Sequence, residues 1–415
     1  MDPTLRLLKQ LIAIDSINPS LVPGAAGEAA IARALVEEFR GIGLEVDVQE
    51  VAPGRPNVVG VLEGRAPGRS LMYCGHIDTV GVSGMTRPFD PAERDGKIYG
   101  RGSQDMKGGV AAMIGAARVI AESGGLSTGR LVIACVVDEE HASIGADALV
   151  TKWRADGGVV TEPTDLRVAI AHKGFEWVEI ETEGRAAHGS RPSEGRDAIR
   201  LMGRVLGGLD ALDRDLQSRA PHPLLGTASL HASLIDGGHE LSSYPDRCHL
   251  QMERRTIPGE APGSAGREVQ ALLDRLRGED ADFKALSRVM FARSPHEIAA
   301  DHPLPVAMQA AVRAQAPSRV PSAASALGWK SSSPQALKSS SPQPGPQRGS
   351  RAGVEALMIG MSFWTDAAVL SEAGIPSILF GPTGGGLHSI EEWVETQSVL
   401  TCRDALVTLA RTWCR

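Results

Sequence analysis

Imidazole and carboxylate side chains follow several apolar stretches of this 415-residue chain. The segment SLMYCGHIDTV ends one such stretch with His76 and Asp78. These residues are two apart in an extended backbone, so both side chains point to the same side. His76 could ligate a metal while Asp78 accepts its other ring proton, as outer-shell carboxylates do. A turn histidine beside a capping aspartate would give the same pattern, because aspartate is common in turns.

A glycine-rich turn, YGRGSQDMKGG, places Asp105 before a predicted helix that starts near Met106. A dinucleotide-binding fingerprint requires a third glycine where Asp105 stands, and an anion there would face the pyrophosphate, so the sequence disfavours a nicotinamide enzyme. Two interpretations of Asp105 stay open. It can cap the following helix, since aspartate is a preferred N-cap, or it can bridge metal ions.

Three adjacent acids, Asp138, Glu139 and Glu140, follow LVIACVV, the most apolar stretch of the chain. Adjacent carboxylates at a buried edge repel one another unless cations compensate them. Because neighbouring side chains in a strand alternate in direction, one glutamate can ligate a metal while the other faces an attacking water. A solvated acidic turn is the alternative, since unpaired acids normally lie in water.

Glu162 in GVVTEPT and His388 in GPTGGGLHSIEEW also follow short apolar or glycine-rich stretches. Together with the residues above, they make a set of two histidines and several carboxylates without a thiolate. Such ligands suit two divalent ions, zinc first, which share a bridging carboxylate and activate a water between them. The residues therefore predict hydrolysis at a dinuclear metal site.

The elements that must position these residues form two predicted domains. Residues 1–173 and 294–415 alternate apolar stretches with helical patterns, which predicts an α/β catalytic domain with a mixed, mostly parallel sheet flanked by helices. Residues 174–293 run strand, helix, strand, strand, helix, strand, the order of an inserted ferredoxin-like α+β domain. Residues 317–353 are rich in Ser, Pro, Gly and Gln and repeat KSSSPQ, so we predict a disordered insert without chemistry.

The composition of the chain limits the kinds of binding partner that can be expected. The formal net charge is -7 and no Lys/Arg run occurs, so neither nucleic acid nor a membrane surface is an expected partner. The N-terminal segment carries no signal-like apolar run, and nowhere do about 18 apolar residues follow one another, so we expect a cytoplasmic protein with a small-molecule substrate. The five cysteines include no C-x-x-C pair, which argues against a disulfide framework and a cysteine zinc site.

Seven segments resemble, in order, the blocks of the zinc-dependent deacylase and exopeptidase family that includes acetylornithine deacetylase, succinyl-diaminopimelate desuccinylase, aminoacylases and glutamate carboxypeptidase. They are GHIDTV, YGRGSQDMKGG, DEEHASIGA, TEPT, HKG, HGSRPSEGRDAI and GGGLHSIEEWV. The resemblance implies two Zn²⁺ ions, which Co²⁺ can replace, with Asp105 bridging both. It further implies His76 and Glu162 in one site and Glu140 and His388 in the other, with Glu139 as the general base and Asp78 orienting His76.

The resemblance also implies that the inserted domain dimerises the chain and covers the active site. His188 in HGSRPSEG would then stabilise an oxyanion in the neighbouring subunit, and Arg255 in ERRTIPGE would hold the substrate carboxylate. A helix-capping histidine and a surface ion pair are the respective alternatives. Ser242 stands where many relatives have asparagine, which weakens an oxyanion role there, and Asp366 receives no role.

We therefore expect a homodimeric dinuclear zinc amidohydrolase that removes the acyl group from an N-acyl amino acid. The HKG and PGE segments look more like the acetylornithine deacetylase branch. A metallo-carboxypeptidase or dipeptidase of the same family is the first alternative. A metal-free binding protein is the second, and it is disfavoured because every ligand position and the base position are filled.

Overall fold

The largest sheet of the protein carries the predicted ligands at its strand ends. The computed structural model describes residues 1–315 and 358–415, so the predicted insert at 317–353 lies outside the described residues. The sheet has the order β1-β2-β6-β3-β7-β15-β8-β13, with β14 also paired to β8. Its strands are β1 (Glu45–Ala52), β2 (Arg55–Glu63), β3 (Ser70–His76), β6 (Arg130–Val136), β7 (Gly158–Val160), β8 (Ala169–His172), β13 (His296–Glu297), β14 (Ile359–Met361) and β15 (Ser377–Leu379).

The centre of this sheet is parallel, and its flanks are largely antiparallel. Strands β6, β3, β7 and β15 run parallel to one another, so their carboxyl ends lie at one edge. Strands β1, β2 and β13 join through antiparallel pairs. The run LVIACVV in and after β6 is fully buried, as expected for a strand covered on both faces. The predicted mixed α/β sheet is confirmed.

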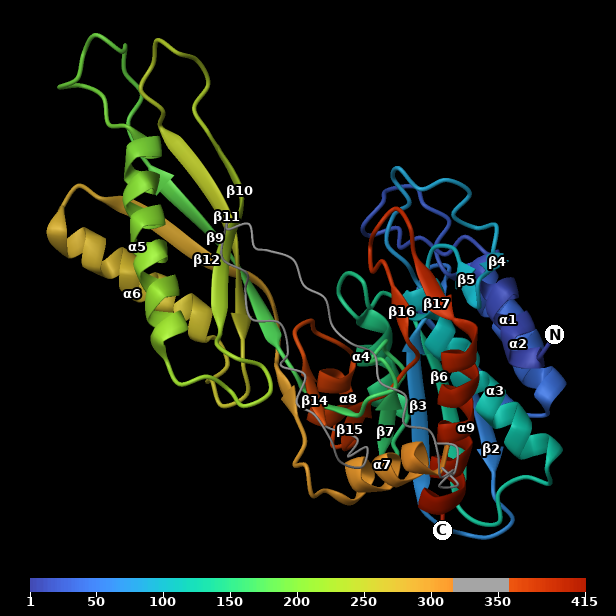
Figure 1. Ribbon diagram of the computed structural model, residues 1–415. Helices are drawn as coiled ribbons and strands as arrows, with labels where there is room; N and C mark the ends of the chain where they lie inside the picture. The colour runs from blue at the N-terminus through green and yellow to red at the C-terminus, as the bar shows by residue number, and fades with distance from the viewer. Residues whose placement is uncertain (316–357) are drawn as a thin grey trace, which may run out of the picture.

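Two groups of helices flank the sheet. Helices α1, α2, α3, α7 and α9 contact one another, and the first and last of these lie side by side although they come from opposite ends of the chain (Figure 1). Helices α4 and α8 form the second group. The bounds are α1 (Pro3–Ile12), α2 (Ala29–Ile42), α3 (Gly108–Glu122), α4 (Ile144–Lys152), α7 (Pro303–Gln315), α8 (Ala367–Glu372) and α9 (Thr396–Trp413).

A second, antiparallel sheet lies within residues 174–293. Its order is β10-β11-β9-β12, and helices α5 and α6 cover one of its faces (Figure 1). The elements follow the chain as a ferredoxin-like unit, as expected, with a separate apolar core. They are β9 (Gly174–Glu183), α5 (Ala198–Ser218), β10 (Ser229–Gly237), β11 (Arg247–Thr256), α6 (Ser264–Glu279) and β12 (Lys284–Arg293).

A small third sheet joins distant parts of the chain beside the site. Its order is β16-β17-β5-β4, with the bounds β4 (Ala92–Arg94), β5 (Lys97–Tyr99), β16 (Gly384–Gly385) and β17 (Trp393–Glu395). The pairing of β17 with β5 brings the segment around His388 next to the glycine-rich turn that contains Asp105. Two predicted ligands nearly three hundred residues apart are thereby held in one place.

No helix in residues 1–315 or 358–415 is long and apolar enough to cross a lipid bilayer.

All five cysteines are buried and none is bonded to another, so they act as small packing residues.

Gly109 provides a test of how tightly α3 packs against the end of β7. A Cβ atom at Gly109 would collide with the main-chain carbonyl of Thr161, whereas one at the exposed Gly41 of α2 would meet no atom within 4 Å. We expect Gly109→Ala to lower the free energy of unfolding by about 1–3 kcal/mol through overpacking. Gly41→Ala should raise it by about 0.5 kcal/mol, because alanine loses less backbone entropy in a helix. Urea unfolding followed by circular dichroism measures both; equal effects would contradict this packing.

Candidate metal centre

The buried ring of His76, the last residue of β3, lies between three carboxyl-bearing residues. Its Nε2 atom lies 3.0 Å from Oδ1 of Asp105 and 3.8 Å from Oε1 of Glu162. Its Nδ1 atom lies 3.0 Å from the main-chain oxygen of Asp78 and 3.5 Å from the carboxylate Oδ1 of the same residue. Asp78 therefore lies beside the ring, and its main-chain carbonyl is a nearer acceptor than its carboxylate.

His388 approaches Asp105 from the other side. Its Nε2 atom lies 3.3 Å from Oδ2 of Asp105 and 3.2 Å from Oε2 of Glu140. Each carboxylate oxygen of Asp105 thus faces a different histidine. A carboxylate placed in this way can bridge two cations, because one oxygen is available to each.

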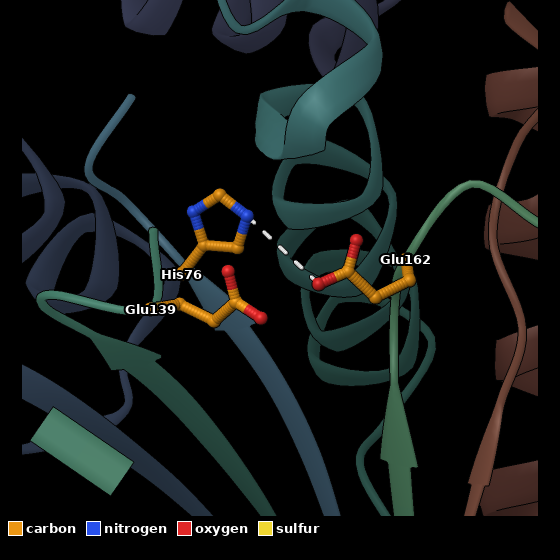
Figure 2. A group of neighbouring side chains, drawn as sticks. All are labelled: His76, Glu139 and Glu162. Atoms are coloured by element: carbon orange, nitrogen blue, oxygen red, sulfur yellow. Dashed lines mark ion pairs between the residues drawn. The ribbon is translucent and has the colours of Figure 1, made fainter. Parts of the chain in front are cut away.

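Glu139 lies within the same group of side chains. Figure 2 shows His76, Glu139 and Glu162 projecting toward one another from the ends of three neighbouring strands. Ligand atoms of these three residues lie within 4.8 Å of one another, as do those of His76, Asp105 and Glu140. Because His76 belongs to both groups, proximity alone does not divide the ligands between two ions. The contact of His76 with Glu162 at 3.8 Å and the contact of His388 with Glu140 at 3.2 Å are compatible with two such ligand pairs.

The turn that carries Asp105 differs from the sequence-based expectation. A short turn, Ser103–Lys107, precedes α3, and the helix begins at Gly108, not near Met106. The N-cap position of α3 is occupied by Lys107, while the carboxylate of Asp105 faces the two histidines. The backbone at Asp105 is non-helical, which is why the helical pattern misplaced the start. The capping interpretation of Asp105 is therefore wrong.

Glu392 fixes the backbone of this turn through hydrogen bonds. Its buried carboxylate accepts hydrogen bonds from the main-chain N–H groups of Gly102 at 3.0 Å, Gln104 at 2.8 Å and Asp105 at 3.0 Å. The guanidinium of Arg101 pairs with the same carboxylate at 2.6 Å. One side chain thus fixes the backbone of the turn. Sequence reasoning did not single out Glu392; its only signal was the IEEW segment that follows His388.

A second set of hydrogen bonds, centred on Asp78, fixes the backbone of Glu139 and Glu140. Its carboxylate accepts hydrogen bonds from the main-chain N–H groups of Glu139 and Glu140, both at 3.2 Å. Asn18 donates to the same carboxylate at 2.8 Å and to Asp138 at 3.1 Å. Asp138, the first of the three adjacent acids, therefore contacts Asn18 and does not face the metal centre. Asn18 lies in no recognisable motif, so its contact with Asp78 could not be predicted from the sequence.

Arg55 binds both Asp138 and Asn18 in this hydrogen-bonded group. Its guanidinium lies 2.8 Å from the carboxylate of Asp138 and pairs with the buried Glu28. It also donates to the amide oxygen of Asn18 at 3.1 Å. These charged groups are buried but paired, so they can stay ionised away from water. Sequence reasoning missed Arg55, because the pairing joins segments with no shared pattern.

The carboxylates of the centre are strongly perturbed. Burial, with the nearby charge of Asp105, raises the pKa of Glu140 to about 7. Burial also raises the pKa of Glu139 and of Glu162 well above the usual value, and neighbouring carboxylates add to the effect. Hydrogen bonds to Asp105 and Glu140 raise the pKa of His388 to about 10. The centre thus contains four carboxyl groups, and only two imidazoles could compensate their negative charge. The carboxyl groups are those of Asp105, Glu139, Glu140 and Glu162, and the imidazoles are those of His76 and His388.

The residues present fit divalent cations. Oε1 of Glu140 is a buried oxygen with no hydrogen-bond partner among the described residues. A buried carboxylate oxygen without a partner is unfavourable unless a charge compensates it. The available donors are imidazole nitrogens and carboxylate oxygens, a set that suits zinc and related ions.

Asp366, for which no role was predicted, lies close to this group. It is buried just before α8, and burial raises its pKa to about 7. Its Oδ1 atom also has no hydrogen-bond partner among the described residues. Asp366 adds another acid to an already acidic surrounding, and its charge contributes to the raised pKa of Glu139.

The two residues predicted from the second sheet lie in different places. Arg255 borders a cavity of about 360 Å³ that Asp105, Glu139 and His388 also line, and its guanidinium pairs with Glu253 at 2.6 Å. His188 does not line this cavity; it is exposed on the loop between β9 and α5. Within one chain, the structure therefore gathers the predicted metal ligands, Glu139, Asp78 and Arg255, and leaves His188 apart.

Comparisons with known proteins identify the family to which the chain belongs. Residues 72–412 match the family model of peptidase family M20/M25/M40. An acetylornithine deacetylase from Photorhabdus laumondii is 34% identical over 268 residues, which cover 62% of this chain and 69% of that protein.

Solved structures share the fold at low sequence identity. A tripeptidase from Staphylococcus aureus superposes with a TM-score of 0.75 at 20% identity, covering 99% of this chain and 98% of that chain. A Bacillus subtilis protein described as a dinuclear metal binding peptidase from the M20 family superposes with a TM-score of 0.68 at 13% identity, covering 99% and 97%. Because the family model spans most of the sequence, the chain belongs to peptidase family M20/M25/M40 and is a metal-dependent hydrolase of amide or peptide bonds.

Proposed function

We propose that this chain is a dinuclear zinc amidohydrolase that removes the acyl group from an N-acyl amino acid. The observation that carries the proposal is the placement of Asp105, whose two carboxylate oxygens each face one histidine. The similarity to an acetylornithine deacetylase supports an acyl amino acid as the substrate class. The structural likeness to peptidases keeps a carboxypeptidase or dipeptidase as the second candidate.

The proposal assigns five ligands. Asp105 would contact both ions, His76 and Glu162 would hold one, and Glu140 and His388 would hold the other. Bound zinc, or cobalt in its place, would polarise the substrate carbonyl and lower the pKa of a bound water toward about 7. Asp78 would keep His76 in a fixed orientation through the contacts to its ring Nδ1.

Glu139 is the proposed general base. Its carboxylate lines the cavity beside the ligands, and its backbone is held by the hydrogen bond to Asp78. A raised pKa suits a carboxylate that takes a proton from the attacking water and then delivers it to the nitrogen of the leaving amine. The proton is thus carried from one side of the scissile bond to the other by a single side chain.

Arg255 is proposed to hold the carboxylate of the substrate. Its side chain borders the cavity and is 31% exposed, so its guanidinium can exchange Glu253 for a substrate carboxylate. The neighbouring Arg254 is fully buried and pairs with Glu260 at 2.5 Å and Glu268 at 3.1 Å. Burial therefore removes Arg254 as a candidate for this task.

The proposal includes a homodimer formed through residues 174–293. Strand β10 is an edge strand of the second sheet, and it exposes 66% of Leu234 and 56% of Ile235. Exposed apolar residues on an edge strand suit pairing with another chain. His188 lies on an exposed loop of the same unit, beside the segment of Ser242, and would act in the neighbouring subunit. We also propose that the enzyme is cytoplasmic, as expected from the sequence.

The Glu139→Gln substitution tests the proposed chemistry. We expect zinc-loaded Glu139→Gln to retain about two zinc ions per chain, because Glu139 is not a proposed ligand, and to lose turnover by about 10²–10⁴-fold. Hydrolysis of N-acetyl and N-succinyl amino acids and of dipeptides gives the rates, and elemental analysis gives the zinc content.

Glu37→Gln, on the outer surface of α2, is the matched control and should leave the rates unchanged. Unchanged turnover of Glu139→Gln would remove Glu139 from the mechanism. Cleavage of dipeptides alone would favour the second candidate function, and a protein that binds no zinc would favour a binding role.

Mixing two inactive variants tests whether His188 acts across a dimer. His188→Ala lacks the histidine but keeps its ligands, whereas Asp105→Asn lacks the bridging carboxylate but keeps His188. After the variants are unfolded together and refolded, we expect about one quarter of wild-type activity, since half of the dimers then contain one complete site. No gain over the separate variants would count against action in trans.

A further inference from the structure

One wall of the cavity beside the metal centre is formed by the second sheet. The face that α5 and α6 leave uncovered presents two rows of side chains across three strands, as the strand register shows. The first row is Arg255, Phe175 and Arg293, and the second row is Glu253, Trp177 and Phe291. All six line the same cavity as the predicted ligands.

Aromatic residues are concentrated at this cavity. The whole chain has 7 Phe, 6 Trp and 3 Tyr, and three of these phenylalanines and two of these tryptophans line this one space. A chain so poor in aromatic residues does not gather them here by composition alone. Large rigid rings at a site of recognition supply contact area at little cost in side-chain entropy.

Some of these aromatic rings are buried in the protein, and others have surface exposed to the cavity. Phe175 and Trp364 are only 8% and 9% exposed, and they meet edge to face with ring centroids 6.2 Å apart. These two join the second sheet to the α/β part of the chain. Trp177 and Phe291 lie 5.6 Å apart and are half-buried, with their open surface toward the cavity. Leu387, which precedes the proposed ligand His388, lines the same cavity and is 41% exposed.

The charges around these rings indicate which substrate group lies against them. The side chain of Arg293 is only 15% exposed, and both Asp147 at 2.7 Å and the main-chain oxygen of Ala142 hold it, so it is less available to a substrate carboxylate than Arg255. The guanidinium of Arg255 lies over the ring of Phe175, with 5.5 Å to the centroid, in the row next to Trp177. A carboxylate held by Arg255 therefore belongs to the same half of the substrate as a group that contacts Trp177.

The same charges disfavour a cationic group at this position. The one acidic residue of the two rows, Glu253, already pairs with Arg255 and accepts a hydrogen bond from Trp177 at 3.0 Å. Arg255 and Arg293 are the two ends of the first row, and both guanidinium groups stack on aromatic rings of the cavity. Beside these rings the two guanidinium groups would repel a further cation, whereas an uncharged ring would cover the open apolar surface.

We infer that Trp177 and Phe291 form a specificity subsite for a large apolar side chain, best an aromatic one, of the amino acid whose carboxylate Arg255 holds. The inference deepens the proposed deacylation and rests on it for the position of the scissile bond. Trp177 and Phe291 contact the substrate side chain and take no part in the proton transfers. N-acyl derivatives of phenylalanine and tryptophan are therefore the preferred substrates.

Calorimetry on the zinc-loaded Glu139→Gln variant tests the subsite without turnover. We expect N-acetyl-L-phenylalanine to bind about 10–100-fold more tightly than N-acetyl-L-alanine, with N-acetyl-L-ornithine no tighter than the alanine compound. Adding Trp177→Ala should reduce the preference for phenylalanine over alanine to about threefold or less, while Trp177→Phe, which keeps a ring, should retain most of it. Trp153→Ala removes a tryptophan outside the cavity and is the matched control.

The outcomes separate the subsite from the proposed function. Equal binding of the three ligands, tighter binding of the ornithine compound, no binding of any of them, or a preference that survives Trp177→Ala would overturn the subsite. If Trp177→Ala does not fold, the ligand order and the Trp177→Phe comparison still decide. Binding in the expected order by a protein that hydrolyses no N-acyl amino acid would leave the subsite standing and remove the deacylation.

Discussion

The carboxylate of Asp105 lies between two imidazoles, 3.0 Å from His76 and 3.3 Å from His388. Its side chain is short, so this placement requires that the backbone be fixed close to both rings. Glu392 fixes it by accepting hydrogen bonds from consecutive main-chain N–H groups of the turn. The pairing of β17 with β5 in turn fixes Glu392, which directly precedes β17. The geometry of the centre therefore depends on contacts between segments that are far apart in sequence.

Charge balance explains why this arrangement and metal dependence belong together. The parallel strands β3, β6 and β7 end at the same edge, so residues that follow them are crowded into one small region. Burial raises the pKa of Glu139, Glu140 and Glu162, which means that the protein alone does not stabilise all of these groups as anions. Cations at this point would restore the ionised forms. The second sheet lines another part of the same cavity with uncharged rings, those of Phe175, Trp177 and Phe291.

The sequence predicted those features that depend on local pattern. Strand ends followed by His76, Glu140 and Glu162 were recognisable because buried parallel strands are continuously apolar and ligands gather at their carboxyl ends. The start of α3 was misplaced because the turn at Asp105 is non-helical within an otherwise helical pattern. Glu392 could not be predicted, since it acts on main-chain groups up to 290 residues away and such a contact leaves no periodic signal. Family resemblance supplied the division of ligands between two ions, which spacing alone left open.

Crystallography of the zinc-loaded protein, with anomalous diffraction at the zinc edge, tests whether Asp105 bridges two metal ions. Two anomalous peaks are expected in the cavity, with the carboxylate of Asp105 in contact with both. One peak should also contact His76 and Glu162, and the other Glu140 and His388. A single peak, or zinc bound without contact to Asp105, would show that Asp105 does not bridge a dinuclear centre.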